Sequence, residues 1–202
     1  MNVTAEELDA LQELINIGVG RAASLLNEMV DSHIRLKIPV VKVLTATEAY
    51  QELTKRFHDE ALAAVKLRFT GSFHGTASLI FPTDSASTLV AVLTGEDPSA
   101  DLDAVKIGTL SEIGNIVING VMGSLSNVLK RHLNYTLPVY LEDTLENLLL
   151  SAYESDSKIL LAQASFTIER FEIIGDIILI FLVGTFDALI TAMKDEMGII
   201  QQ

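Results

Sequence analysis

The spacing of apolar residues predicts an amphipathic helix near the start of the chain. From Thr4 to Met29 the apolar side chains recur with a period of about 3.6 residues. Thr4 followed by Glu7 has the spacing of a capping box, in which two side chains satisfy free backbone amides of the first turn. The stripe that we expect to face the core consists of Leu8, Leu11, Ile15, Ala22, Leu25, Leu26 and Met29.

The pattern then predicts a strand, a helix, two strands and a further helix. These elements are expected at residues 33–43, 47–57, 61–69, 73–81 and 84–93, the last of them stopping at Gly95. Pro39 lies inside the first strand, which indicates an edge strand or a bulge. Residues 95–99 combine turn residues with charge and are the best linker candidate.

The second half of the chain repeats this order. A long helix is predicted over 103–131, a strand over 135–141, a helix over 144–152, two strands over 158–170 and 172–183, and a closing helix over 186–197. Glu13, Asn16 and Pro39 recur as Glu112, Asn115 and Pro138 at an offset of 99 residues, and Gly75 recurs as Gly175 at an offset of 100. We therefore predict a single α+β domain built from two copies, residues 1–97 and 98–202. In this pseudo-two-fold arrangement a β-sheet is covered by helices, with both long helices on one surface.

Each long helix carries a Glu and an Asn three residues apart, opposite its apolar stripe. Small residues surround both pairs, where a solvated helix face usually carries long side chains. They are Ala5, Gly20, Ala23 and Ser24 in the first copy, and Ala104, Gly108, Gly123 and Ser126 in the second. A single pair could be ordinary solvated surface. Two such Glu/Asn pairs, each surrounded by small residues, favour a surface that another macromolecule can approach closely.

Composition narrows the classes of function. The 202 residues include 27 acidic and 14 basic side chains, a net charge of −13, which disfavours nucleic-acid binding through a basic face. The absence of cysteine excludes disulfides, thiolate zinc sites and a Cys nucleophile. No apolar run is long enough to span a membrane and no signal-peptide pattern is visible. We expect a cytoplasmic protein with no membrane insertion and no nucleic-acid partner.

The doubled motif resembles the CheC/CheX/FliY family of chemotaxis phosphatases, most closely its CheC members, which carry two such copies. The family pattern is Glu-x-x-Asn, then 22 residues and a Pro, with Asp or Ser four residues before the Glu. Asp9, Glu13, Asn16 and Pro39 satisfy it in the first copy, and Glu112, Asn115 and Pro138 in the second. Gly108 stands at the Asp/Ser position of the second copy. The resemblance extends over essentially the whole chain.

The resemblance implies hydrolysis of the aspartyl-phosphate on the response regulator CheY. Asn16 and Asn115 would then hold a water in line with the phosphorus, because an amide both donates and accepts hydrogen bonds. Glu13 and Glu112 would dock on the active-site lysine of the regulator. A general-base role for the glutamates is the competing interpretation, disfavoured because an exposed carboxylate is a weak base at neutral pH. The regulator would supply Mg²⁺, and we expect no metal site or cofactor in this chain.

Two other functions need consideration. A non-catalytic CheC-like adaptor could bind CheD or a response regulator to tune chemotactic adaptation. A flagellar-switch role like that of FliY is less favoured, because the chain ends shortly after the second copy. Gly18 and Gly20 superficially match a dinucleotide-binding fingerprint, but they lie inside a helical pattern rather than after a strand. A kink in the helix or close helix packing is the better interpretation of these glycines.

Overall fold

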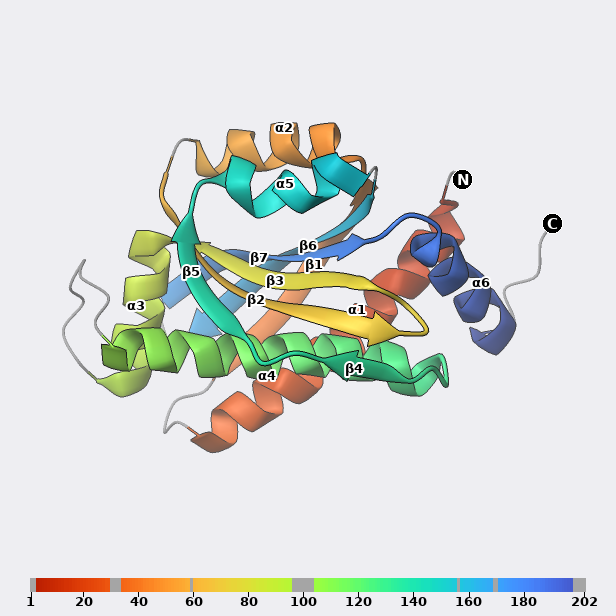
Figure 1. The fold of residues 1–202 in the computed structure, drawn as a ribbon. Helices are drawn as coiled ribbons and strands as arrows, with labels where there is room; N and C mark the ends of the chain where they lie inside the picture. Colours follow the sequence, from red (N-terminus) through yellow and green to blue (C-terminus); the bar gives the residue numbers. More distant parts are fainter. Residues whose placement is uncertain are drawn as a thin grey trace.

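One antiparallel sheet of seven strands forms the middle layer of the protein (Figure 1). The computed structural model describes residues 3–29, 34–58, 60–95, 104–155, 157–168 and 171–197. The strands are β1 (Ile34–Leu44), β2 (Leu62–Gly71), β3 (Gly75–Pro82), β4 (Leu133–Tyr135), β5 (Val139–Asp143), β6 (Lys158–Ile168) and β7 (Phe171–Phe181). Their order across the sheet is β1-β6-β7-β3-β2-β4, and β5 also pairs with β2.

Helices cover both faces of this sheet. They are α1 (Ala5–Met29), α2 (Ala46–Phe57), α3 (Thr83–Thr94), α4 (Ala104–Val128), α5 (Leu145–Ser155) and α6 (Thr185–Met197). The long helices α1 and α4 lie on one face and α2 and α5 on the other, while α3 and α6 lie near the two ends (Figure 1). Strand residues alternate between two apolar cores: Val65 packs in the core of α1 and α4, and Ala64 in that of α2 and α5. The predicted α+β class and order of helices are confirmed.

The two halves of the chain exchange strands. At the centre of the sheet, β3 of the first half pairs with β7 of the second. On either side, β1 pairs with β6, and β4 and β5 pair with β2, so each half adds strands to the sheet of the other half. The two predicted copies therefore share one continuous sheet.

The motif helices α1 and α4 cross with their backbones in contact at two glycines. A Cβ added at Gly18 would lie 2.4 Å from the Gly120 carbonyl oxygen, and one at Gly120 would lie 2.6 Å from the Gly18 oxygen. Next to this crossing the Ser124 hydroxyl donates a hydrogen bond to the Leu14 carbonyl at 2.9 Å. Of the two interpretations of these glycines, a kink or close packing, close packing is confirmed at Gly18, whereas a Cβ at Gly20 would meet no atom within 4 Å. The dinucleotide fingerprint is wrong because both of its glycines lie within α1.

Three local features of the helices and strands agree with the predictions made from the sequence. The capping box of α1 forms, since the Thr4 amide donates to Glu7 at 2.8 Å and the Glu7 amide to the Thr4 hydroxyl at 3.2 Å. Gly95 ends α3 in the left-handed conformation, with φ 75°. The rest of the linker candidate, residues 96–99, lies outside the described residues. Pro39 lies in an edge strand whose register shifts between Lys37 and Val40, as predicted.

Two predictions of local structure were wrong. The strand predicted over 135–141 is divided into β4 and β5, because the backbone around Pro138 leaves the ladder. The apolar stripe predicted for α1 was wrong at the C-terminal end of the helix, where Leu25 is 50% exposed and Met29 is 59% exposed. The rest of the stripe is buried at Leu11, Ile15, Ala22 and Leu26, and the buried face also includes Leu14 and Val19, which the prediction left out. None of the described helices is long and apolar enough to cross a bilayer.

Candidate functional site

The Glu-x-x-Asn pairs occupy equivalent places on the two packed helices of one sheet face. Glu13 on α1 and Glu112 on α4 are exposed, as expected. Asn16 and Asn115 are half-buried rather than clear of the core. Gly108, like Gly20, is open to solvent, since a Cβ added at either position meets no atom within 4 Å. The structure thus leaves both glutamates accessible to a partner and holds both asparagines at the edge of the core.

Asn16 is tied to the backbone of β1. Its Oδ1 accepts from the Ile38 amide at 3.2 Å, and its Nδ2 donates to the Ile38 carbonyl at 3.4 Å. The ladder to β6 shifts register at this point, between Lys37 and Val40, because Pro39 has no N–H to donate. Asn16 therefore satisfies backbone groups that the bulge takes out of the sheet. This contact gives a physical reason for a proline 23 positions after the asparagine.

Asn115 has different surroundings. Its Oδ1 accepts a hydrogen bond from the Asn119 amide at 2.7 Å, and both residues lie on α4. Within the described chain no hydrogen bond joins Asn115 to Leu137, which occupies the place of Ile38 in the second copy and is 85% exposed. Among the described residues no acceptor is recorded for the side-chain amide hydrogens of Asn115, which leaves both available to a water or a ligand. The two sites are alike in sequence but unlike in their hydrogen bonds.

Glu112 borders a hollow that was not predicted from the sequence. A cavity of about 400 Å³ lies beside it, with apolar walls from Leu26, Met29 and Val105. Gly108 lines this hollow and has no side chain to fill it. The equivalent residue in the first copy is the exposed Asp9. The second motif therefore presents a carboxylate next to an apolar surface.

The described residues contain no group of three or more His, Asp or Glu arranged to hold a metal ion. His74 and His132 are both exposed, and His132 shares a hydrogen bond of 3.2 Å with Asn134.

Sequence reasoning missed two groups of charged residues. Arg56 on α2 pairs with the fully buried Asp176 on β7, with Nη1 and Oδ1 2.5 Å apart. Burial raises the pKa of Asp176 to about 7, although the Arg56 charge lowers it. Lys66 and Arg68 on β2 line the mouth of a cavity at the sheet edge. The signal for the second group was present, because Lys-x-Arg in an apolar strand places two cations on one face.

Comparison with known sequences identifies relatives of this chain. Residues 63–160 match the family described as "Chemotaxis phosphatase CheX". That segment contains the second motif, Glu112, Asn115 and Pro138. The chain is also 28% identical over 143 residues to the CheY-P phosphatase CheC of Bacillus subtilis (strain 168). This match covers 67% of the chain and 66% of the relative, a little under two thirds of the relative's length.

Solved structures share the fold. FliY of Thermotoga maritima superposes with a TM-score of 0.78 at 16% identity, covering 97% of this chain and all of that one. FliM in the FliG–FliM complex from H. pylori superposes with a TM-score of 0.69 at 14% identity, covering 94% of this chain and all of that one. At these identities the likeness concerns the fold alone.

Proposed function

The chain belongs to the CheC/CheX/FliY family, and we propose that it is a cytoplasmic CheC-like phosphatase that hydrolyses the aspartyl-phosphate of a CheY-type response regulator. The observation that carries the proposal is the second motif. Glu112 is exposed and Asn115 keeps its amide hydrogens free, on a helix inside the segment that matches the family of chemotaxis phosphatases.

Asn115 would position the attacking water. Asn119 holds its Oδ1 on one side, which fixes the plane of the amide and leaves Nδ2 to donate. A residue that aligns water with a phosphorus atom acts by reducing the entropic cost of reaching the in-line geometry. Glutamine has a comparable role in small GTPases.

Glu112 would fix the register of the complex. An exposed carboxylate can pair with a lysine of the regulator, and such pairs contribute more to orientation and encounter rate than to affinity. The apolar hollow beside Glu112 adds surface that a partner can cover. Mg²⁺ would come with the regulator.

Asn16 and Glu13 would form a second, weaker site. The bonds of Asn16 to Ile38 use its oxygen and one amide hydrogen, so only one donor remains for a water. In this proposal the first copy retains the motif mainly for its structural contact, and the second copy carries most of the activity.

The test is a dephosphorylation assay with a purified regulator that has been phosphorylated by a small-molecule donor. We expect the full chain to accelerate phosphate loss at substoichiometric concentration. A binding measurement with the same regulator accompanies the assay. Binding without acceleration would reject the phosphatase proposal in favour of an adaptor.

The adaptor is the second candidate. The related FliM structure contains FliG as well, so the same fold occurs in a protein–protein complex. In this alternative the chain binds CheD or a response regulator without removing phosphate. Pull-down with each purified protein, combined with the assay above, separates the two functions.

A further inference from the structure

A cavity opens where the edge of the sheet is interrupted between β4 and β5. β2 pairs with β4 up to Phe69–Tyr135 and with β5 from Lys66–Val139. Between these pairs the edge segment leaves the ladder, and Thr136 holds it to β2 through two hydrogen bonds of 3.0 Å with the Arg68 backbone. The cavity beside this bulge has a volume of about 590 Å³.

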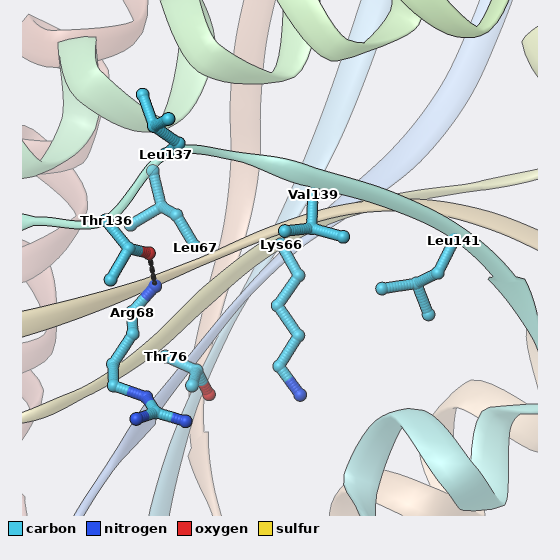
Figure 2. Close-up of a pocket in the computed structure, with 8 residues that line it drawn as sticks. All are labelled: Lys66, Leu67, Arg68, Thr76, Thr136, Leu137, Val139 and Leu141. Atoms are coloured by element: carbon cyan, nitrogen blue, oxygen red, sulfur yellow. Dashed lines mark hydrogen bonds between the residues drawn. The ribbon is translucent and has the colours of Figure 1, made fainter.

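Register places the polar groups of this cavity on one face of the sheet. Arg68 lies directly opposite Thr76, and Lys66 is two residues from Arg68 along β2. Val139 lies opposite Lys66, so it is on the same face. Figure 2 shows Lys66, Arg68 and Thr76 extending in the same direction from their strands. Further along β2 and β5, the helices α2 and α5 cover this same face of the sheet.

The walls of the cavity are apolar. Leu67, Leu137, Val139 and Leu141 line it, and Val139 is 59% exposed. A smaller hollow of about 260 Å³ continues past Arg68 and Thr76 towards Leu182, which is 44% exposed. Large exposed apolar side chains around a concave surface are typical of a binding site rather than of solvated surface.

Three polar groups at this cavity have no ion-pair or side-chain hydrogen-bond partner recorded among the described residues. No ion pair involves Lys66 or Arg68 within the described part of the chain, although the protein carries a net charge of −13. Burial lowers the pKa of the Lys66 ammonium, and the Arg68 charge lowers it further. The Thr76 hydroxyl is buried without a hydrogen-bond partner. A bound anion would satisfy all three groups.

We propose that this cavity binds a small amphipathic organic anion, with a phosphate or carboxylate head between Lys66, Arg68 and Thr76 and an apolar body against Val139 and Leu141. The cavity volume is within the range of small-molecule sites, about 300–1,000 Å³. An acidic macromolecule fits less well, because the rest of this acidic chain would repel it.

Titration calorimetry of the full chain with octyl phosphate tests the proposal. Octanol, which keeps the apolar body without the charge, and inorganic phosphate, which keeps the charge without the body, are the control ligands. We expect saturable 1:1 binding of octyl phosphate, and binding of each control at least about tenfold weaker. Octanoate in place of octyl phosphate identifies the preferred head.

Variants locate the site. Lys66→Gln with Arg68→Gln is expected to weaken octyl phosphate binding about tenfold or more. Arg35→Gln with Lys37→Gln is the matched control, because these residues have the same spacing and are exposed on β1, at the opposite edge of the sheet. Thr76→Val is expected to weaken binding without lowering thermal stability, since it removes an unsatisfied hydroxyl. Amide shift changes in wild-type protein provide a readout that needs no substitution.

The proposal is wrong if octyl phosphate does not bind at millimolar concentration or binds no better than octanol. It is also wrong if the β2 variant and the β1 control bind equally, or if the shifts map away from residues 66–68 and 136–141. The test contains no response regulator, so either outcome leaves the proposed phosphatase activity unaffected.

Discussion

The side-chain amide of Asn16 makes two hydrogen bonds to the backbone of Ile38, 22 residues further along the chain. The bonds span the bulge of β1, where Pro39 interrupts the ladder. A residue chosen from the sequence for its chemistry thus also supports the fold. In the second copy Asn115 has no such contact with Leu137 in the described structure, and this difference between the copies is testable.

Replacing Asn16 should cost stability. Asn16→Ala leaves the Ile38 amide and carbonyl without their partner, and we expect a loss of about 1–3 kcal/mol of unfolding free energy. Asn115→Ala is the matched variant and should change stability by less than about 0.5 kcal/mol. Urea denaturation measures both. Equal losses would show that the bonds to Ile38 do not contribute as argued.

The crossing of α1 and α4 predicts opposite effects for two neighbouring glycines. Gly18→Ala forces a methyl group against the Gly120 carbonyl, and overpacking of this kind costs about 1–3 kcal/mol or more. Gly20→Ala places its methyl in open space and should stabilise the helix by about 0.5–1 kcal/mol. Thermal unfolding of the two variants gives the comparison. A tolerated Gly18→Ala would contradict the close backbone contact.

Much of the fold was predictable because it depends on local patterns. The periodicity of α1, the Thr4–Glu7 box and the effect of Pro39 are properties of short segments. The division of the strand at Pro138 was missed, because it depends on how β2 pairs with two separate segments. The periodicity of one helix does not show where the neighbouring helix ends. Leu25 and Met29 were therefore assigned to the core, although both are exposed.

The candidate site was predictable only in its residue types. Spacing identified the two motifs, but the bond from Asn16 to Ile38 and its absence at Asn115 depend on tertiary contacts. The pair of Arg56 and Asp176 joins residues 120 positions apart, and no local pattern indicates it.

Stability should depend on pH through Asp176. Its pKa of about 7 in the folded protein exceeds the value of about 3.9 in an unfolded chain, so the folded state binds more protons between these values. The Asp176 contribution to stability is therefore present near pH 4 and is lost as the pH rises towards 7. Asp176→Asn removes this contribution.

The measurement is the unfolding free energy of wild type minus that of Asp176→Asn, followed from pH 4 to pH 8. We expect this difference to fall as the pH rises through the window. Asp195→Asn, which removes an exposed carboxylate near the end of α6, is the control. A difference that rises with pH would mean that the Arg56 charge outweighs burial.

Glu112 should act in docking rather than in proton transfer. Glu112→Gln is expected to raise KM for the phosphorylated regulator about fivefold at low salt, with kcat little changed. Glu28→Gln, an exposed glutamate at the end of α1, is the control and should leave both constants unchanged. A fall of about 100-fold in kcat for Glu112→Gln would favour a general base instead.

The most direct test is the rate of regulator dephosphorylation by Asn115→Ala, Asn16→Ala and the double variant. Asn127→Ala, an exposed asparagine near the end of α4, is the matched control. Loss of water positioning at Asn115 should reduce the rate about 100-fold, while Asn16→Ala should retain most of it at a temperature where it is folded. Full activity of Asn115→Ala would contradict the proposed role of the second motif.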